Sequence, residues 1–278
     1  MRVVLAENAG TCFGVQRALD LAEEVAGRGE PASTLGPIIH NPRVVGELAA
    51  RGVAPVEEPK DVETHTVVVR SHGVLPEVRE ALDARGLDVV DATCPYVLRA
   101  QRSAERLARE GRLVVVVGEA GHPEVEGLVA WARRGGADVL VVASAAEVPE
   151  EPPARVGVVV QTTQRKAVLD EVVRAVGERC GDVSVQNTIC SATTARQDAA
   201  AALAASVDAM VVLGGRNSSN TTRLAEICRA VGAKTFHVES PDELGAADFE
   251  GCETVGVTAG ASTPQGQIEE IVCALEAI

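Results

Sequence analysis

The stretch LDVVDATCPYVLRAQRSAERLA, residues 87–108, runs from a short valine-rich segment through a lone cysteine into a segment with helical spacing. The same order occurs at residues 3–22, VVLAENAGTCFGVQRALDLA, and at residues 183–204, VSVQNTICSATTARQDAAAALA. Each copy predicts a strand, a short loop that ends at a cysteine, and a helix. Cys12, Cys94 and Cys190 are 82 and 96 residues apart, each separation close to one third of the 278 residues.

The three helical segments each carry an apolar stripe. We expect the buried positions to be Val15, Ala18, Leu19 and Ala22 in the first segment, Val97, Ala100, Ala104 and Leu107 in the second, and Ala195, Ala199 and Leu203 in the third. A unit repeated three times predicts three similar lobes. If the lobes pack around a pseudo-threefold axis, the three thiols converge, and helix amino termini near them favour thiolates and bound anions.

Ten β-branched runs alternate with helical segments along the chain. They are RVVLAE, TVVVRS, LDVVDA, LVVVVG, DVLVVAS, VGVVVQ, DVSVQ, AMVVLGG, KTFHVE and TVGVTAG. This alternation predicts an α/β protein with mainly parallel sheets, in which ligands lie at the carboxyl ends of the strands. We expect lobes at residues 13–95, 96–190 and 191–278, with an N-terminal strand within residues 1–12 as a candidate addition to the third.

Composition excludes several classes of protein. The formal charge of −14 and the aromatic content of 2% argue against a nucleic-acid binder and against an anionic membrane surface as a partner. Seven cysteines are an odd number, they are scattered, and no leader segment or long apolar span is evident. We therefore expect a cytoplasmic protein with reduced thiols.

Free cysteine is often only a small buried apolar residue. That interpretation fits Cys180, Cys228, Cys252 and Cys273, which have no shared context. Cys12, Cys94 and Cys190 share one, and the chain has no CxxC pair that would indicate a zinc ribbon or a thioredoxin-type site. Three distant ligands leave one coordination position open on a zinc ion or an iron-sulfur cluster, and an open position is typical of catalysis.

Three of the five histidines, His40, His72 and His122, follow candidate strands or loops and precede a proline that can open a helix. They are candidates for anion binding at helix amino termini, although one histidine in such a place is equally often a helix cap. His65 and His237 lack this context. Glu124, two residues after His122, could deliver a proton if it is held near apolar groups, or it could be a solvated residue of the first helical turn.

Loops rich in hydroxyl and amide groups follow three other candidate strands. They offer Thr162 and Thr163, then Asn217, Ser218, Ser219 and Asn220, and finally Ser262. Each could be a helix N-cap, and together they could bind a multiply charged phosphate. Because no GxxxxGK[ST] or GxGxxG run occurs, a small phosphorylated substrate is a better prediction than a nucleotide.

Nine motifs along the chain resemble the 4-hydroxy-3-methylbut-2-enyl diphosphate reductase family in order and approximate spacing. They are GTCFGV, HNPRVV, SHGV, DATCP, GHPEVEG, QTT, CSATTARQ, NSSNTTRL and TAGASTP. The resemblance covers nearly the whole chain and implies three α/β lobes around a central cavity. It also implies reductive removal of the substrate hydroxyl as water, with two electrons and two protons, to give isopentenyl and dimethylallyl diphosphates.

The resemblance assigns roles to individual residues. It implies that Cys12, Cys94 and Cys190 hold a [4Fe-4S] cluster with an open apical iron, that Thr162 lies near the substrate hydroxyl, and that Glu124 delivers protons. It implies that the allylic diphosphate is bound by His40, His72, His122, Thr193, Ser218, Ser219, Asn220 and Ser262. Ferredoxin or flavodoxin is the implied electron donor, and such acidic donors would need a local basic patch on this acidic protein.

Two positions depart from the family pattern. Thr11 stands where phenylalanine or proline is frequent, and Pro42 stands where arginine is common, so both affect the fine geometry beside the site. Two alternatives stay open from the residues alone: a zinc-dependent hydrolase that uses the same cysteines, and a noncatalytic iron-sulfur sensor.

Overall fold

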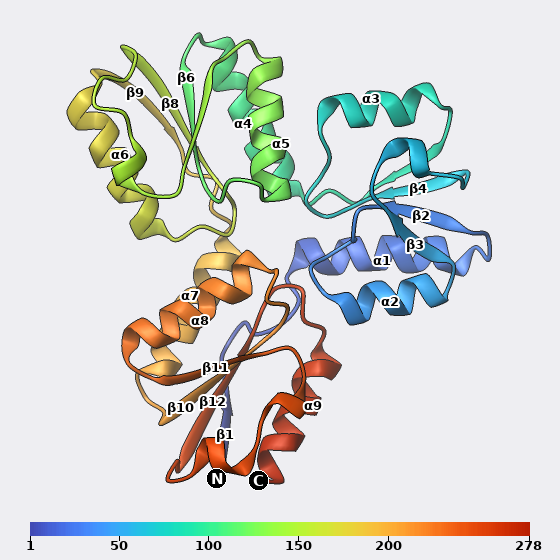
Figure 1. The fold of residues 1–278 in the computed structure, drawn as a ribbon, viewed down its shortest axis with the longest axis vertical. Helices are drawn as coiled ribbons and strands as arrows, with labels where there is room; N and C mark the ends of the chain where they lie inside the picture. Colours follow the sequence, from blue (N-terminus) through green and yellow to red (C-terminus); the bar gives the residue numbers. More distant parts are fainter. The chain divides into compact units, whose positions relative to one another are not determined.

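The computed structural model describes residues 1–278 and contains nine α-helices, twelve strands and four short 3-10 helices. The strands form three four-stranded sheets, and every strand pair is parallel, so the protein is an α/β protein of three parallel-sheet lobes (Figure 1). The chain forms two compact units. The first contains residues 1–16, 40–44 and 191–278, and the second contains residues 17–39 and 45–190.

The second unit holds two of the three sheets. One sheet is built from β2 (Ala32–Leu35), β3 (Val53–Val56), β4 (Thr66–Val69) and β5 (Asp88–Asp91), and the other from β6 (Leu113–Val117), β7 (Val139–Val142), β8 (Arg155–Val160) and β9 (Asp182–Gln186). The helices between these strands are α2 (Pro42–Ala50), α3 (Pro76–Ala84), α4 (Pro95–Arg109), α5 (Pro123–Arg134) and α6 (Lys166–Arg179), with η1 (Pro59–Asp61) and η2 (Ala145–Glu147).

The first unit holds the third sheet. Its strands are β1 (Arg2–Leu5), β10 (Ala209–Leu213), β11 (Lys234–Val238) and β12 (Thr254–Ala259). The helices of this lobe are α7 (Ser191–Ala204), α8 (Ser219–Val231) and α9 (Gln265–Glu276), with η3 (Pro241–Glu243) and η4 (Ala246–Phe249). Helix α1 (Phe13–Gly27) follows β1.

The three sheets have one topology. Their strand orders are β3-β2-β4-β5, β7-β6-β8-β9 and β11-β10-β12-β1. In each sheet the fourth position is an edge strand that leads into a long helix, α4 after β5, α7 after β9 and α1 after β1. The N-terminal strand therefore completes the sheet made by the C-terminal third of the chain, while the lobe boundaries at residues 95/96 and 190/191 stay predictions.

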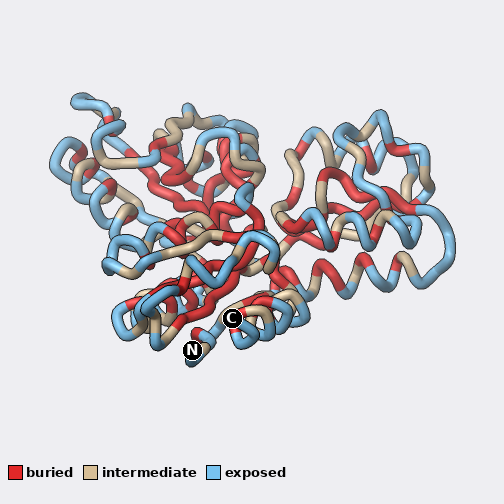
Figure 2. Tube along the Cα trace, turned by 60° about the horizontal axis from the view of Figure 1, so that its bottom comes forward, coloured by how far each residue is buried: buried red, intermediate tan, exposed pale blue.

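The valine-rich strands alternate between two buried faces, as expected for parallel strands covered on both sides. In β6, Val114 and Val116 pack with α4 and α5, whereas Val115 and Val117 pack with α6. The third sheet is covered by α9 on one face and by α7 and α8 on the other. Figure 2 accordingly shows the buried residues along the strands and the exposed residues on the outer turns of the helices.

The ten predicted strands all occur, and two further strands, β2 and β3, were not predicted. Each has only four residues. Strand β2 contains the polar Ser33 and Thr34, which are buried. Strand β3 contains Pro55, and proline lacks a backbone N–H donor, so it is tolerated in an edge strand such as β3. Neither segment has the β-branched run on which the prediction depended.

The stripe predicted for the third cysteine helix is wrong by one position. Ala195 is exposed and Ala199 and Leu203 are only half-buried, while the buried positions of α7 are Thr193, Arg196, Gln197, Ala200 and Ala204. Alanine covers most of this helix, so periodicity alone does not define its buried face. The stripes predicted in α1 and α4 are confirmed, since every member is buried.

None of the helices combines the length and the apolar character that crossing a bilayer requires.

Candidate active site

The three repeated cysteines occupy the same local position in the three lobes. Cys12 directly precedes α1, Cys94 is the N-cap residue of α4, and Cys190 directly precedes α7. None of the three forms a disulfide. A helix amino terminus carries partial positive charge, so each of the three cysteines lies where a bound anion is favoured.

The backbone holds the three cysteines in the same way. The N–H groups of Cys12, Cys94 and Cys190 donate to the carbonyl oxygens of Ala261, Ser71 and Thr162, at 3.4, 2.9 and 3.0 Å. Each acceptor lies just beyond the strand that neighbours the cysteine's own edge strand, β12, β4 or β8. The repeat in the sequence therefore corresponds to one strand-to-helix turn that occurs three times in the structure.

Glu124 and Thr162 form a buried pair in the second unit. Glu124 lies in the first turn of α5 and is 2% exposed. The backbone N–H of Thr162 donates to Glu124 Oε1 at 2.6 Å, and the Thr162 hydroxyl donates to Oε2 at 2.8 Å. Thr162 lies at the carboxyl end of β8, and its carbonyl accepts from Cys190. One residue thus links the carboxyl group to a cysteine turn.

Burial raises the pKa of Glu124 above its ordinary value, and the two hydrogen bonds from Thr162 oppose that shift. The carboxyl group is therefore easier to protonate than a solvated glutamate, as a proton donor near neutral pH requires. The interpretation of Glu124 as a solvated residue of the first turn is wrong. It does fit its neighbour Glu126, which is exposed.

Two of the predicted histidines lie together in the second unit. The rings of His72 and His122 are 5.7 Å apart, in an edge-to-face arrangement. His122 caps α5, and its Nδ1 accepts from the Glu124 N–H at 3.1 Å. Because Nδ1 accepts, the proton of a neutral ring lies on Nε2, which can donate to a ligand.

The helix starts predicted after the three histidines are confirmed, because Pro42, Pro76 and Pro123 are the first residues of α2, α3 and α5. The histidines themselves are not equivalent under the repeat. His40 and His122 follow the first strands of their lobes, β2 and β6, whereas His72 follows β4. Ser71, Thr162 and Ala261 accept from the three cysteine N–H groups, so the residues that correspond to His72 are the next ones, Thr163 after β8 and Ser262 after β12.

The loop after β10 supplies polar groups in the first unit. Ser218 is the N-cap of α8, and its hydroxyl accepts from the Thr221 N–H at 3.4 Å. Ser219 and Asn220 are buried in the first turn. Asn220 is 4% exposed, and neither its Nδ2 nor its Oδ1 has a hydrogen-bond partner. A buried amide without partners is costly, so its donor and acceptor fit a ligand that binds at this helix terminus.

The His40 segment belongs to the first unit. Asn41 Nδ2 donates to the Ser262 carbonyl at 2.8 Å, and Asn41 Oδ1 caps α2 by accepting from Val44. The His40 carbonyl lies so near Gly215 that a Cβ there would be 3.0 Å from it. His40 thus lies beside the loops that carry Ser218 and Ser262. Asn41 was not predicted, and its place before a proline-initiated helix was the available signal.

Thr193 and Arg196 connect α7 to the same region of the first unit. Both are buried, and Arg196 Nη2 donates to the carbonyl of Gly10, two residues before Cys12, at 2.7 Å. Thr193 lies one turn before Arg196 on the helix that Cys190 precedes. The first unit therefore gathers predicted site residues from five segments: Cys12, His40, Thr193, Ser218, Ser219, Asn220 and Ser262.

The second unit gathers the others: His72, Cys94, His122, Glu124, Thr162 and Cys190. Two buried glutamines that were not predicted lie among them. Gln161 Oε1 accepts from the Glu119 N–H at 3.0 Å, and Gln101 lies against Gly73 and Gly127. Neither Nε2 group has a partner. The meeting of all three thiols at one metal centre stays a prediction.

The remaining cysteines and histidines differ in their surroundings. Cys180 and Cys228 are buried, as a small apolar residue should be, and burial raises the pKa of Cys228 to about 11. Cys273 is exposed, so the buried interpretation is wrong for it. His237 Nε2 lies 3.0 Å from the Gly214 carbonyl, and burial lowers its pKa, which is consistent with a structural role.

The family model described as LytB protein matches residues 3–276. The chain belongs to the LytB protein family. A 4-hydroxy-3-methylbut-2-enyl diphosphate reductase of Geobacter sp. strain M21 is 50% identical to this LytB protein over 280 residues, which are 100% of this chain and 98% of the relative. The protein of that name from Anaeromyxobacter sp. strain K is 47% identical over 100% of both chains.

Two solved structures resemble the LytB chain over nearly its full length. One, described as (E)-4-hydroxy-3-methyl-but-2-enyl diphosphate reductase, the terminal enzyme of the non-mevalonate pathway, has 43% identity and a TM-score of 0.73, with 100% of both chains covered. The other, a reductase structure from Plasmodium falciparum, has 24% identity and a TM-score of 0.90 over 99% of this chain and 87% of its own. The second supports the fold alone.

Proposed function

We propose that this LytB protein is a 4-hydroxy-3-methylbut-2-enyl diphosphate reductase. The reaction takes two electrons and two protons, breaks the bond between the allylic carbon and the hydroxyl oxygen, and releases water. The products are isopentenyl and dimethylallyl diphosphates. Relatives that are 50% and 47% identical over the full length of this chain carry this name.

One structural observation carries the proposal. The equivalent strand-to-helix turn of every lobe ends in a cysteine that forms no disulfide. A structural zinc site is normally formed by four ligands that include a CxxC pair, and this chain offers three separate thiols instead. Three thiolates and one open position fit a [4Fe-4S] cluster that binds substrate, because sulfur ligands are those that iron-sulfur clusters require.

The residues present fit such a cluster by their chemistry. Cys12, Cys94 and Cys190 would be the ligands, and each lies at the amino terminus of a helix, whose partial positive charge favours a bound anionic group. When bound, the cluster would pass on the two electrons from an external donor and would offer a Lewis-acidic iron for the departure of the hydroxyl group. None of the seven cysteines forms a disulfide, which agrees with the proposed reduced, cytoplasmic compartment.

The protein's own residues bind the substrate and supply the protons. Eight side chains would offer donors to a diphosphate. They are the amide of Asn220, the helix caps Ser218 and His122, and His40, His72, Thr193, Ser219 and Ser262. Hydrogen bonds to a charged acceptor are about twice as strong as neutral ones, so the diphosphate can fix the position of the hydroxyl group. Glu124 holds a proton next to the Thr162 hydroxyl and delivers it toward the leaving oxygen.

The test begins with protein purified without oxygen. We expect iron and acid-labile sulfide in the wild type, and a single turnover of 4-hydroxy-3-methylbut-2-enyl diphosphate with dithionite as the reductant. Cys12→Ser, Cys94→Ser and Cys190→Ser should each lose iron and turnover, while Cys273→Ser, at an exposed cysteine outside the repeat, should keep both.

Colourless protein with stoichiometric zinc would contradict the proposal and favour a hydrolase. A brown protein that leaves the diphosphate unchanged would favour a sensor. The physiological electron donor is proposed to be a ferredoxin or a flavodoxin.

A further inference from the structure

Helix α4 is the most basic helix of an acidic protein. It carries Arg99, Arg102, Arg106 and Arg109 against one glutamate, a net charge of +3 in a chain of net charge −14. The four arginines are spaced by three, four and three residues, so they lie on one side of the helix. All four are exposed. We call these four residues the arginine stripe.

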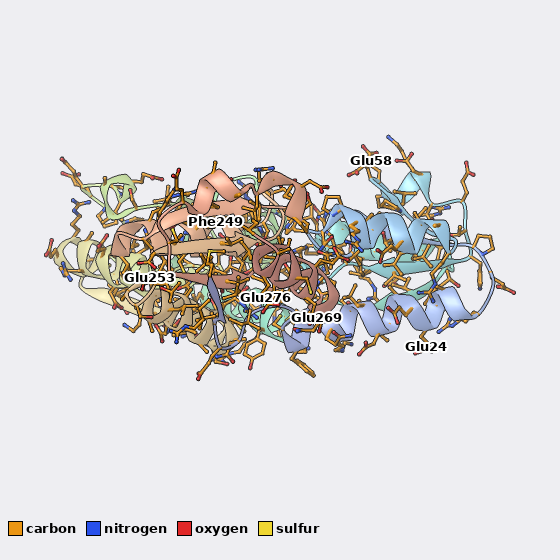
Figure 3. The ribbon with its side chains drawn as sticks, turned by 90° about the horizontal axis from the view of Figure 1, so that it is seen from below. Glu24, Glu58, Phe249, Glu253, Glu269 and Glu276 are labelled. Atoms are coloured by element: carbon orange, nitrogen blue, oxygen red, sulfur yellow. The ribbon has the colours of Figure 1, made fainter.

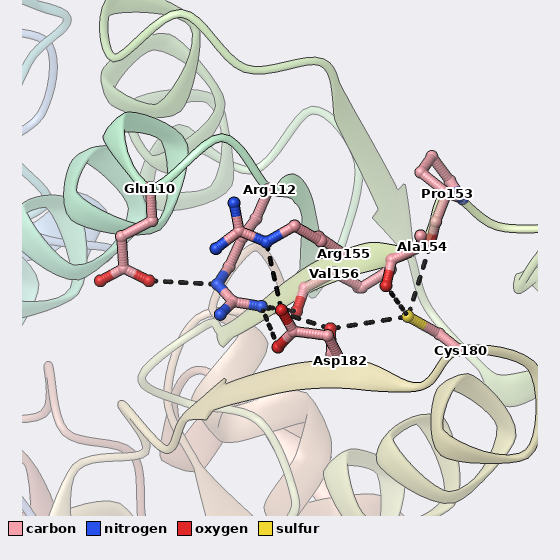
Figure 4. A network of polar contacts seen from close by, with 8 residues as sticks. All are labelled: Glu110, Arg112, Pro153, Ala154, Arg155, Val156, Cys180 and Asp182. Carbon is pink, nitrogen blue, oxygen red and sulfur yellow. Dashed lines mark hydrogen bonds and ion pairs between the residues drawn. The ribbon is translucent and has the colours of Figure 1, made fainter.

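Many other cations of the surface form ion pairs with carboxylates. Figure 4 shows one example at the start of β9, where Asp182 accepts from Arg112 at 2.7 Å and from Arg155 at 3.1 Å while Arg112 also donates to Glu110. Exposed carboxylates lie along other helices, such as Glu24 on α1 and Glu269 and Glu276 on α9 (Figure 3). A local excess of positive charge is therefore unusual here.

Three members of the stripe have no acidic partner. Arg99 and Arg102 make no hydrogen bond or ion pair, and Arg106 donates only to the neutral side chain of Gln186 on β9. Only Arg109 is paired, with Glu105. Exposed charges without partners stabilise the fold little, so these three side chains are free to attract a partner of opposite charge.

The stripe runs along the helix that begins at Cys94. With a rise of 1.5 Å per residue, Arg99 and Arg102 are about 8 and 12 Å along the helix axis from that cysteine. Arg106 reaches over β9, the strand that leads to Cys190. Tyr96, the single tyrosine of the chain, is half-buried at the start of the same helix. Tyrosine and arginine are the residues enriched where proteins bind one another.

We propose that the arginine stripe of α4 is the docking surface for a small acidic electron-carrier protein. The inference rests on the proposed function, because a reductase needs an external source of electrons. The carrier would meet the protein beside two cysteine turns, where the path for its electrons to Cys94 and Cys190 is short. Charge complementarity would act mainly on the association rate. Both proteins carry net negative charge, so attraction at the stripe must overcome the repulsion between the two molecules.

The test compares two triple variants of equal charge. In the stripe variant, Arg99, Arg102 and Arg106 are changed to Gln. In the control variant, three exposed arginines without ion pairs on other elements, Arg51, Arg174 and Arg229, are changed to Gln. Both variants change the net charge from −14 to −17, so only the position of the lost charge differs.

Binding is measured by calorimetry with an acidic flavodoxin at low ionic strength, and turnover is measured with reduced flavodoxin and with dithionite. We expect the stripe variant to lose at least about tenfold in flavodoxin affinity and in the second-order rate constant, with little change in the control. Added salt should weaken flavodoxin binding by the wild type and remove the difference between the variants. Turnover with dithionite should be equal in all three proteins.

Equal flavodoxin affinities of the stripe and control variants would overturn the inference, whatever the reductase assay gives. Absence of dithionite turnover in the wild type would instead contradict the proposed function, and the binding comparison would still decide the docking surface. A single-stranded RNA that binds the wild type and not the stripe variant, with flavodoxin binding unchanged, would assign the stripe to nucleic acid and also overturn the inference.

Discussion

At the scale of single residues, Glu124 is the clearest case of a side chain whose surroundings suit a reaction. Changing Glu124→Gln keeps its size and an acceptor for the Thr162 N–H but removes the proton that can be donated. We expect the variant to keep its iron and its affinity for the diphosphate and to lose about 100-fold in single-turnover rate. Glu126→Gln, at the exposed neighbouring carboxylate, should retain wild-type rates, and full activity of the Glu124 variant would exclude it from proton delivery.

The same residue predicts a pH dependence of stability. Because the pKa of Glu124 is raised in the folded state, the folded protein binds an extra proton between the ordinary pKa near 4.5 and the raised value. The free energy of unfolding should therefore fall as the pH rises through this window. The fall should be absent in Glu124→Gln, so urea titrations at several pH values should show the difference between the two proteins changing in favour of the variant with rising pH.

Sequence motifs predicted most of the chemistry at this scale, because thiols, carboxylates and histidines are recognisable by type. Buried amides are not. Asn41, Gln101 and Gln161 look like ordinary polar residues in the sequence, and only the fold shows that they are buried beside the site residues. The burial of Glu124 likewise depends on the packing of α5 beside the end of β8, which the sequence does not show.

At the scale of elements, the start of α8 depends on a glycine in the β12–α9 loop. A Cβ at Gly260 would collide with the Thr221 hydroxyl, which is fully buried in the first turn of α8. We expect Gly260→Ala to cost about 2 kcal/mol of stability, as overpacking typically does, and to weaken diphosphate binding by displacing Asn220. Urea unfolding and calorimetry would measure both effects.

A second substitution makes this prediction specific. Thr221→Ala removes the atoms with which the new Cβ collides, so the double variant should be more stable than the sum of the two single changes implies. Additive losses would contradict the proposed collision.

Elements with a strong pattern were predictable, and elements with a weak one were not. The valine runs of β6 and β8 and the arginine-to-alanine alternation of α4 define their faces. In contrast, α7 is so rich in alanine that its polar residues Arg196 and Gln197 decide which side is buried, through contacts that the sequence does not display. The strand β2 is buried despite Ser33 and Thr34 because Ser33 accepts from the Thr64 hydroxyl at 3.0 Å and Thr34 donates to Gly36.

At the scale of the whole molecule, joining the two ends of the chain would give all three sheets the same order of strands along the chain. Met1 and Ile278 line the same surface pocket of about 440 Å³, so a short glycine linker can join the two ends. After joining, β1 would follow α9 as β5 follows α3 and β9 follows α6. New ends can be placed between Glu150 and Glu151, which are both exposed in the loop before β8.

We expect this permuted chain to fold, with the circular dichroism spectrum, iron content and dithionite turnover of the wild type. A chain opened between Val158 and Val159, inside buried β8, should fail to fold and serves as the control. Aggregation of the first permuted chain would contradict the equivalence of β1 with β5 and β9.

The position of β1 also has a consequence for synthesis. Val3 and Val255 are partners in the third sheet, yet 252 residues separate them in the chain. At a translation rate of 5–20 residues per second, β1 leaves the ribosome about 13 to 50 s before β12 exists to receive it. The second unit can mature during that interval, whereas β1 must wait, unpaired, for a strand that is made far later.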